Sequence, residues 1–101
     1  MAPGKSAPGA GQEVSGPEVV VYSTGFCGYC QRAKALLQHK GIPYREIRID
    51  EVPGAREEML ARSNGLRTVP QIFIGERHIG GFDALHALDR SGELDSLWKA
   101  P

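Results

Sequence analysis

The sequence lacks the features that identify several large classes of protein. Basic and acidic side chains balance at 12 each, so neither a nucleic-acid footprint nor a polybasic membrane surface is expected. No apolar run approaches the roughly 18 residues that a membrane-spanning helix requires. The 101 residues include only two cysteines, fewer than a small disulfide-stapled secreted domain normally carries. These absences favour a small globular domain in a reducing compartment.

The N-terminal segment, residues 1–17, predicts a flexible tail. It is rich in glycine, alanine, proline and serine and shows no hydrophobic periodicity. It lacks the apolar stretch of a secretory signal, and Lys5 is its only basic residue, whereas transit peptides usually carry several arginines. One folded domain is therefore expected over residues 18–101.

Hydrophobic periodicity in the rest of the chain predicts alternating strands and helices. Strands are expected over residues 18–23, 44–49, 71–74 and 77–79, and helices over 28–40, 53–63, 84–90 and 94–98. Gly41 should end the first helix, Gly75-Glu76 suits a hairpin turn, and Asp83 should cap the third helix. The first strand, helix and second strand make a parallel βαβ unit. The order βα-βα-ββ-αα predicts an α/β fold, with a mixed sheet of about four strands flanked by helices.

The cysteines form a Cys-x-x-Cys pair, Cys27 and Cys30, where the first strand leads into the first helix. A disulfide between them closes a tiny loop and adds little stability, so its expected value is chemical. The unpaired N–H groups and positive dipole end of a helix start favour a thiolate at Cys27. Cys30 lies one turn further in on the apolar side, so it should be less ionised. Because the thiolate is the nucleophile of disulfide exchange, Cys27 is the predicted attacking sulfur and Cys30 the resolving one.

Two other uses of the cysteine pair are less well supported. A structural zinc site needs four Cys or His ligands, and His39, His78 and His86 show no ligand spacing to the pair. No metal site is therefore predicted, and these histidines are assigned no chemistry. The other alternative is an inert pair of buried cysteines. A Cys-x-x-Cys motif after the first strand of a βαβ unit favours redox use over both.

Beyond the cysteine pair, the chain from about Glu18 to Lys99 resembles the glutaredoxin family of the thioredoxin-like superfamily. The matching segments are Tyr22–Ser23, Cys27–Cys30, Arg32–Leu37, Arg56–Met59, Thr68–Ile74 and His78–Asp83. The chain is most similar to short bacterial dithiol glutaredoxins. The resemblance implies a thioredoxin-like fold and a glutathione-dependent oxidoreductase that serves electron transport and cell redox homeostasis. Such an enzyme reduces glutathione mixed disulfides and protein disulfides, with glutathione as the reducing co-substrate.

The resemblance also implies a glutathione groove beside the cysteine pair. Its residues are Tyr29, Arg67, Thr68, Val69, Pro70, Gly81, Phe82 and Asp83. Val69–Pro70 is expected to be a cis peptide bond, and Val69 to offer its N–H and C=O to an extended ligand. The N–H groups of Phe82 and Asp83 would take the γ-glutamyl carboxylate, and the Asp83 carboxylate would take the ammonium group.

Most of these groove residues also have a plainer interpretation. Without the resemblance, Pro70 would be a trans proline that starts an edge strand. Tyr29 would be an exposed aromatic side chain, Arg67 a solvated one, and Gly80-Gly81 a turn before a helix cap. With the resemblance, Tyr29 becomes a wall of the groove and Arg67 reaches the glycine carboxylate of glutathione.

The chain departs from the family pattern at two positions near Cys27. Gly28 stands where many members carry proline, and Thr24 where many carry a lysine that pairs with the glycine carboxylate of glutathione. Arg67 or Lys34 would then supply that charge. In the family, the loss of proline at this position goes with a [2Fe-2S] cluster between two protomers, held by each Cys27 and by glutathione. The alternative function is a cluster-binding dimer that acts in cluster transfer or redox sensing.

The expected partners are glutathione and proteins that carry disulfides or bound glutathione, with no nucleic acid and no membrane. A monomer is expected, or a dimer if a cluster is bound. The expected location is the cytoplasm, because a cysteine pair that cycles requires reducing surroundings.

Overall fold

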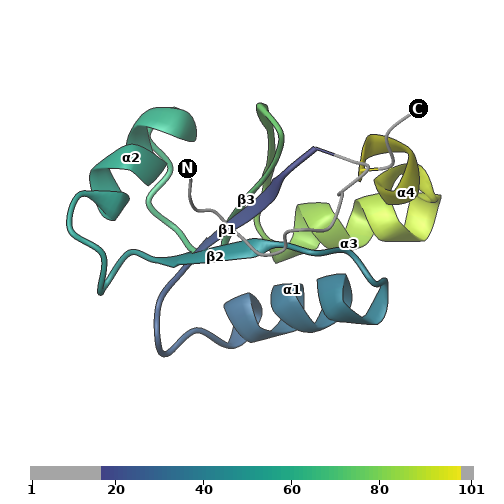
Figure 1. Ribbon diagram of the computed structural model, residues 1–101, viewed down its shortest axis with the longest axis horizontal. Helices are drawn as coiled ribbons and strands as arrows, with labels where there is room; N and C mark the ends of the chain where they lie inside the picture. The colour runs from purple at the N-terminus through teal and green to yellow at the C-terminus, as the bar shows by residue number, and fades with distance from the viewer. Residues whose placement is uncertain (1–16, 99–101) are drawn as a thin grey trace, which may run out of the picture.

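The structure, a computed structural model, describes residues 17–98 and consists of a sheet with helices on both faces (Figure 1). The elements in chain order are β1 (Val19–Ser23), α1 (Gly28–His39), β2 (Arg45–Arg48), α2 (Ala55–Arg62), β3 (Gln71–Ile74), β4 (Arg77–Gly80), α3 (Phe82–Ser91) and α4 (Glu93–Trp98). The predicted order of strands and helices is confirmed, with boundaries shifted by one or two residues at most ends.

The strand directions bring the loop before α1 and the loop before β3 to the same end of the sheet. Its strand order is β2-β1-β3-β4, with β1 parallel to β2 and antiparallel to β3. The predicted parallel βαβ unit is therefore confirmed, as is the hairpin turn between β3 and β4. Because of these directions, the carboxyl ends of β1 and β2 lie at the same end as the amino end of β3. The loop that leads into α1 and the loop that precedes β3 meet there.

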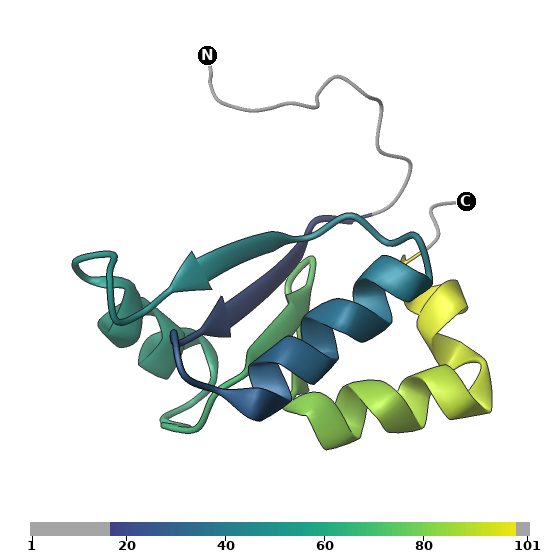
Figure 2. The same ribbon diagram turned by 90° about the horizontal axis from the view of Figure 1, so that it is seen from below.

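Both faces of the sheet are covered, as Figures 1 and 2 show from two directions. On one face Val19 and Val21 pack with Leu37 of α1 and Leu85 of α3. The opposite face packs against α2 and includes Val20, Tyr22, Ala55, Met59 and Phe73. Alternate residues of β1 therefore serve opposite cores, which explains why this strand is a continuous apolar run.

Two helix boundaries show what the sequence predicts well and what it does not. Gly41 ends α1 with φ at 73°, in the left-handed region that favours glycine, as predicted. The predicted cap of α3 by Asp83 is wrong. The helix begins at Phe82, its N-cap is Gly81 in an extended conformation, and Asp83 lies in the first turn. A glycine before the helix allows the chain to enter it two residues earlier than predicted.

The predicted N-terminal tail and the predicted lack of a membrane-spanning helix are taken in turn. The predicted tail over residues 1–17 lies, apart from Pro17, outside the described residues and stays a prediction. Across residues 17–98, no helix combines the length and apolar character needed to span a bilayer.

Candidate active site

Cys27 occupies the N-cap of α1, with its sulfur directed at two backbone groups. Its Sγ accepts a hydrogen bond from the Cys30 N–H at 3.1 Å and lies 3.7 Å from the carbonyl oxygen of Val69. The side chain is partly exposed. A sulfur that takes a helix-start N–H has a donor ready for the negative charge of a thiolate. The predicted position of Cys27 at the helix start is confirmed.

Cys30 lies one turn deeper and is fully buried. Burial raises the pKa of the Cys30 thiol to about 12, and its hydrogen bond with Cys27 adds to the rise. The Thr24 backbone and the charge of Lys34 lower the same pKa, but by less. Cys30 is therefore a thiol at neutral pH, as the sequence predicted, and the two sulfurs differ in exposure.

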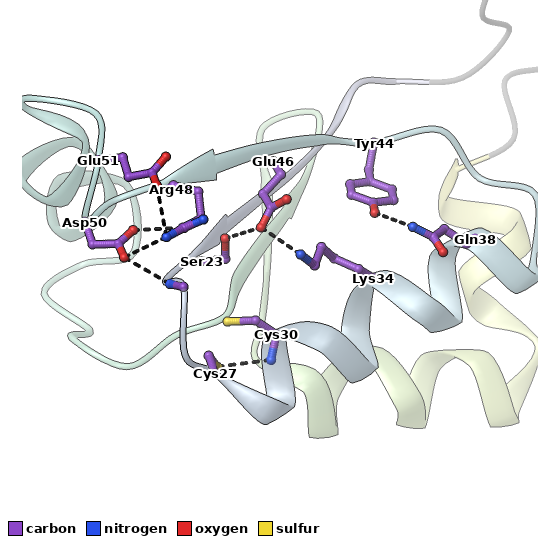
Figure 3. A network of polar contacts seen from close by, with 11 residues as sticks. Ser23, Cys27, Cys30, Lys34, Gln38, Tyr44, Glu46, Arg48, Asp50 and Glu51 are labelled. Atoms are coloured by element: carbon purple, nitrogen blue, oxygen red, sulfur yellow. Dashed lines mark hydrogen bonds and ion pairs between the residues drawn. The ribbon is translucent and has the colours of Figure 1, made fainter.

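A half-buried ion pair lies beside Cys30, between α1 and β2 (Figure 3). The Lys34 Nζ is 2.9 Å from the Glu46 carboxylate, which also accepts a hydrogen bond from the Ser23 hydroxyl. Burial alone would raise the pKa of Glu46, but the hydrogen bonds from Ser23 and Lys34 outweigh it and hold that pKa below its ordinary value. Lys34 is thus engaged by Glu46 and is not the free cation that the sequence offered as a replacement for a lysine at Thr24.

The loop before β3 brings several predicted groove residues to Cys27. Val69–Pro70 is a cis peptide bond, as the family resemblance implied. The Val69 carbonyl faces the Cys27 sulfur, and the Pro70 carbonyl lies next to Gly81, where a Cβ would be 3.5 Å away. A side chain at position 81 would thus be in ordinary van der Waals contact with this loop, so the start of α3 lies directly against it.

The first turn of α3 completes the ring of predicted residues. The centroid of the Phe82 ring lies 6.3 Å from that of the Tyr29 ring, so these side chains of α3 and α1 lie next to each other. Asp83 is exposed in the same turn. The first bond within the helix runs from the Leu85 N–H to the Gly81 carbonyl, so the N–H groups of Phe82 and Asp83 remain available to an anion. Arg67 precedes Thr68 and is exposed, and within residues 17–98 its side chain makes no hydrogen bond or ion pair with the other groove residues.

The loop that carries Cys27 is fastened to β2 by an ion pair. Arg48 holds Asp50 through two contacts of 2.9 Å, and Asp50 in turn accepts the Gly25 N–H at 3.0 Å (Figure 3). A Cβ at Gly25 would collide with the Arg48 guanidinium. This contact is not predicted from the sequence, because it joins residues 25 apart that meet only when β1 and β2 pair in parallel.

Replacing Asp50 with asparagine is expected to make stability less dependent on acid pH. The Arg48 hydrogen bonds lower the pKa of Asp50 to about 2 from its ordinary 3.8. A lowered folded-state pKa stabilises the protein above about pH 4, and this contribution is lost as the pH falls towards 2. Denaturation midpoints of the wild type and Asp50→Asn should differ modestly at pH 7, because the pair is solvent-accessible, and converge near pH 2. A difference that is the same at both pH values would contradict this role.

The contacts of Gln71 and His78 are likewise not predicted from the sequence. The Gln71 Nε2 donates to the Thr68 carbonyl at 3.0 Å, and the His78 Nε2 lies 2.6 Å from the Gln71 Oε1. Thr68 is thereby connected to β4, one of the two edge strands of the sheet. No local sequence signal indicates this connection, because it depends on the β3–β4 register and its irregularity at Ile72/Phe73.

Comparison with known proteins shows that this chain has close relatives. A family model described as Glutaredoxin matches residues 19–79, more than half of the chain. A glutaredoxin of Pseudomonas aeruginosa is 57% identical over 84 residues, which cover 83% of this chain and 99% of that protein. Glutaredoxin 3 of Escherichia coli is 54% identical over 81 residues, 80% of this chain and 96% of that protein. The crystal structure of a buckwheat glutaredoxin–glutathione complex has a TM-score of 0.73 at 38% identity, covering 84% of this chain and 78% of that one. The predicted thioredoxin-like fold is confirmed.

Proposed function

The chain belongs to the glutaredoxin family of thiol–disulfide oxidoreductases, and from this premise we propose that it reduces disulfides with electrons from glutathione. The observation that carries the proposal is the placement of the Cys27 sulfur. It accepts a helix-start N–H, faces the backbone of Val69 and is partly exposed, whereas Cys30 is buried. This arrangement suits one attacking sulfur and one resolving sulfur.

Reduction of a glutathione mixed disulfide requires Cys27 alone. Its thiolate attacks the glutathione sulfur, which forms a Cys27–glutathione disulfide and releases the other thiol as a thiolate. A second glutathione thiolate then attacks the bound glutathione sulfur, which frees Cys27 and yields glutathione disulfide. The two electrons come from glutathione, and no tightly bound cofactor is needed.

Reduction of a protein disulfide adds a step at Cys30. Cys27 first forms a mixed disulfide with the substrate protein, and Cys30 then attacks the Cys27 sulfur and releases the second substrate thiol. For this attack the Cys30 thiol must lose its proton, and the positive charge of Lys34 favours the thiolate that results. Glutathione afterwards reduces the Cys27–Cys30 disulfide.

The groove residues have complementary chemistry for the parts of glutathione. The Val69 backbone would pair with the cysteinyl residue of glutathione, and Thr68 and Pro70 hold that backbone in place. The N–H groups of Phe82 and Asp83 would take the γ-glutamyl carboxylate. Arg67 is the cation available to the glycine carboxylate. The buckwheat relative was crystallised as a glutathione complex, which supports the same ligand here.

The test is a coupled assay on a small glutathione mixed disulfide. Glutathione reductase converts the glutathione disulfide formed in each cycle back to glutathione, and NADPH consumption reports the rate. The proposal predicts turnover that saturates with the mixed disulfide and requires glutathione. A second measurement follows release of the substrate's thiol directly by chromatography, without the reductase. Release that proceeds equally fast with another small thiol in place of glutathione would overturn the proposal.

Exposed apolar side chains near Cys27 favour protein substrates. Within the described residues, the exposed large hydrophobic side chains are those of Phe26, Tyr29, Val52 and Leu66. All four lie at the end of the sheet where β1 and β2 finish and β3 begins. Because exposed apolar residues gathered in one region mark interaction sites, we infer substrate proteins with apolar residues beside the disulfide. Such proteins would be met in a reducing compartment such as the cytoplasm.

Replacing Phe26 with serine is expected to separate protein substrates from small ones. Phe26 precedes Cys27 and is fully exposed, so its ring can lose water-exposed area only when a partner covers it. The kcat/KM for a glutathionylated protein should fall about 3- to 10-fold, while the value for a small glutathione mixed disulfide should not change. Equal losses on both substrates would show that Phe26 supports the fold of the site instead.

A second candidate function, a cluster-binding dimer, is favoured by the open surroundings of Cys27. A Cβ at Gly28 would meet nothing within 4 Å, so the first turn of α1 leaves room for another molecule. Cys27 is the accessible thiol, and the described residues contain no group of three or more His, Cys, Asp or Glu that could hold a metal ion. One chain therefore supplies one thiolate, and two protomers with two glutathione molecules would supply the four that a [2Fe-2S] cluster needs.

Anaerobic reconstitution with iron, sulfide and glutathione tests the second candidate. A brown dimer that forms with Cys30→Ser but not with Cys27→Ser, and only with glutathione, would support it. A colourless monomer from the unmodified chain would exclude it and leave the oxidoreductase proposal intact.

A further inference from the structure

The buried amide of Gln71 joins Thr68, in the loop before β3, to His78 on β4. Gln71 opens β3 and is 1% exposed. Its Nε2 donates to the Thr68 carbonyl at 3.0 Å and to the Thr68 hydroxyl at 3.1 Å. Its Oε1 lies 2.6 Å from the His78 Nε2 on β4. Both ends of the amide are therefore engaged, as expected for a buried polar side chain.

These contacts fix the orientation of the amide and the tautomer of the histidine. A carbonyl oxygen only accepts hydrogen bonds, so the Gln71 group that faces Thr68 must be the NH2. The oxygen of the same amide then faces His78 and needs a donor. The His78 Nε2 must therefore carry a hydrogen, in the neutral ring as well as in the charged one.

The Thr68 carbonyl belongs to the peptide group that also carries the Val69 N–H. Peptide groups are planar, and the cis bond at this place is Val69–Pro70, so Thr68–Val69 is trans. In a trans peptide the C=O and N–H point in opposite directions. Holding the Thr68 oxygen therefore sets the direction of the Val69 N–H, which donates to no group within residues 17–98.

We propose that His78 is a positioning residue. Through Gln71 and the Thr68 carbonyl, it directs the Val69 N–H towards the glutathione molecule that reacts with Cys27. The inference rests on the proposed function, in which the Val69 backbone pairs with the cysteinyl residue of glutathione. His78 touches neither ligand nor sulfur and acts on binding only. The carbonyl of Val69 already faces the Cys27 sulfur at 3.7 Å, so the direction of the N–H decides whether both groups of Val69 serve one ligand.

His78 makes a second contact, which the experiment must separate from the first. Its ring stacks on the Phe73 ring at a centroid distance of 4.8 Å and an interplanar angle of 29°. His78→Phe keeps an aromatic ring for this stack and removes the donor. His78→Gln removes the ring and keeps an N–H donor at about the same reach. The exposed His39, in the last turn of α1, provides the matched control His39→Phe.

Steady-state kinetics on a small glutathione mixed disulfide give the first test. His78→Phe should raise KM about 3- to 10-fold with kcat within about twofold, because the lost hydrogen bond serves binding rather than the sulfur chemistry. His78→Gln and His39→Phe should match the wild type. If His78→Phe behaves like the wild type, or His78→Gln fails as His78→Phe does, the positioning role is wrong.

Nuclear magnetic resonance on the ligand-free protein gives a test that does not depend on turnover. The Val69 amide resonance should shift in His78→Phe and stay in place in His39→Phe. In the unmodified chain the His78 ring should be the Nε2–H tautomer, and an Nδ1–H tautomer would overturn the inference even if the variants fail to fold. An unmodified chain that has this tautomer but no glutathione-dependent turnover would instead refute the proposed function.

Discussion

Cys27→Ser is expected to lower the turnover of a glutathione mixed disulfide by at least about a thousandfold, to the uncatalysed background. A serine hydroxyl stays protonated at neutral pH and cannot attack a disulfide sulfur as a thiolate does. The buried Cys30 cannot take over, because burial raises its pKa to about 12. The measurement is the coupled NADPH assay, with circular dichroism to show that the variant is folded.

Near-normal turnover by Cys27→Ser would contradict the assignment of the attacking sulfur. It would mean that Cys30 reaches substrate despite having no exposed surface. Its thiol would then have to become accessible through movement of the first turn of α1.

Cys30→Ser is expected to divide the two reactions. Reduction of a glutathione mixed disulfide should keep at least about a third of the wild-type rate, because glutathione itself resolves the Cys27 intermediate. Reduction of a protein disulfide should fall at least about tenfold, because no second sulfur remains to release the substrate. The variant should also accumulate a mixed disulfide between Cys27 and the substrate protein, visible by mass spectrometry.

The matched comparison uses one protein in two forms, internally disulfide-bonded and glutathionylated. If Cys30→Ser reduces both forms as the wild type does, the resolving role of Cys30 is wrong. If it loses both, the buried Cys30 side chain is required for the packing around Cys27.

The placement of Cys27 is a part of the site that the sequence predicts well. A valine run followed by a helical period locates a strand and a helix, and Cys27 falls at their junction. The N-cap position follows from that pattern alone. The burial of Cys30 follows from its place on the apolar stripe with Ala33 and Leu37, and these residues are buried in the structure.

Contacts between distant residues could not be predicted in the same way. Asp50 reaches the Gly25 N–H only because β1 and β2 pair in one register. The His78–Gln71 contact depends on the irregular β3–β4 ladder. The error at Asp83 has a local cause, since both Gly81 and Asp83 are acceptable N-cap residues and the sequence does not choose between them.

The preference of Cys27 for glutathione is best measured in Cys30→Ser, which has a single thiol. The second-order rate constant for attack by Cys27 is measured on glutathione disulfide and on cystine. Each value is divided by the rate constant for attack of a small free thiol on the same disulfide, which corrects for the different reactivity of the two disulfides. The groove predicts a normalised rate at least about tenfold higher for glutathione disulfide, a preference that Asp83→Ala should reduce. Equal normalised rates would contradict the account, because Cys27 would then be a reactive thiol without a glutathione site.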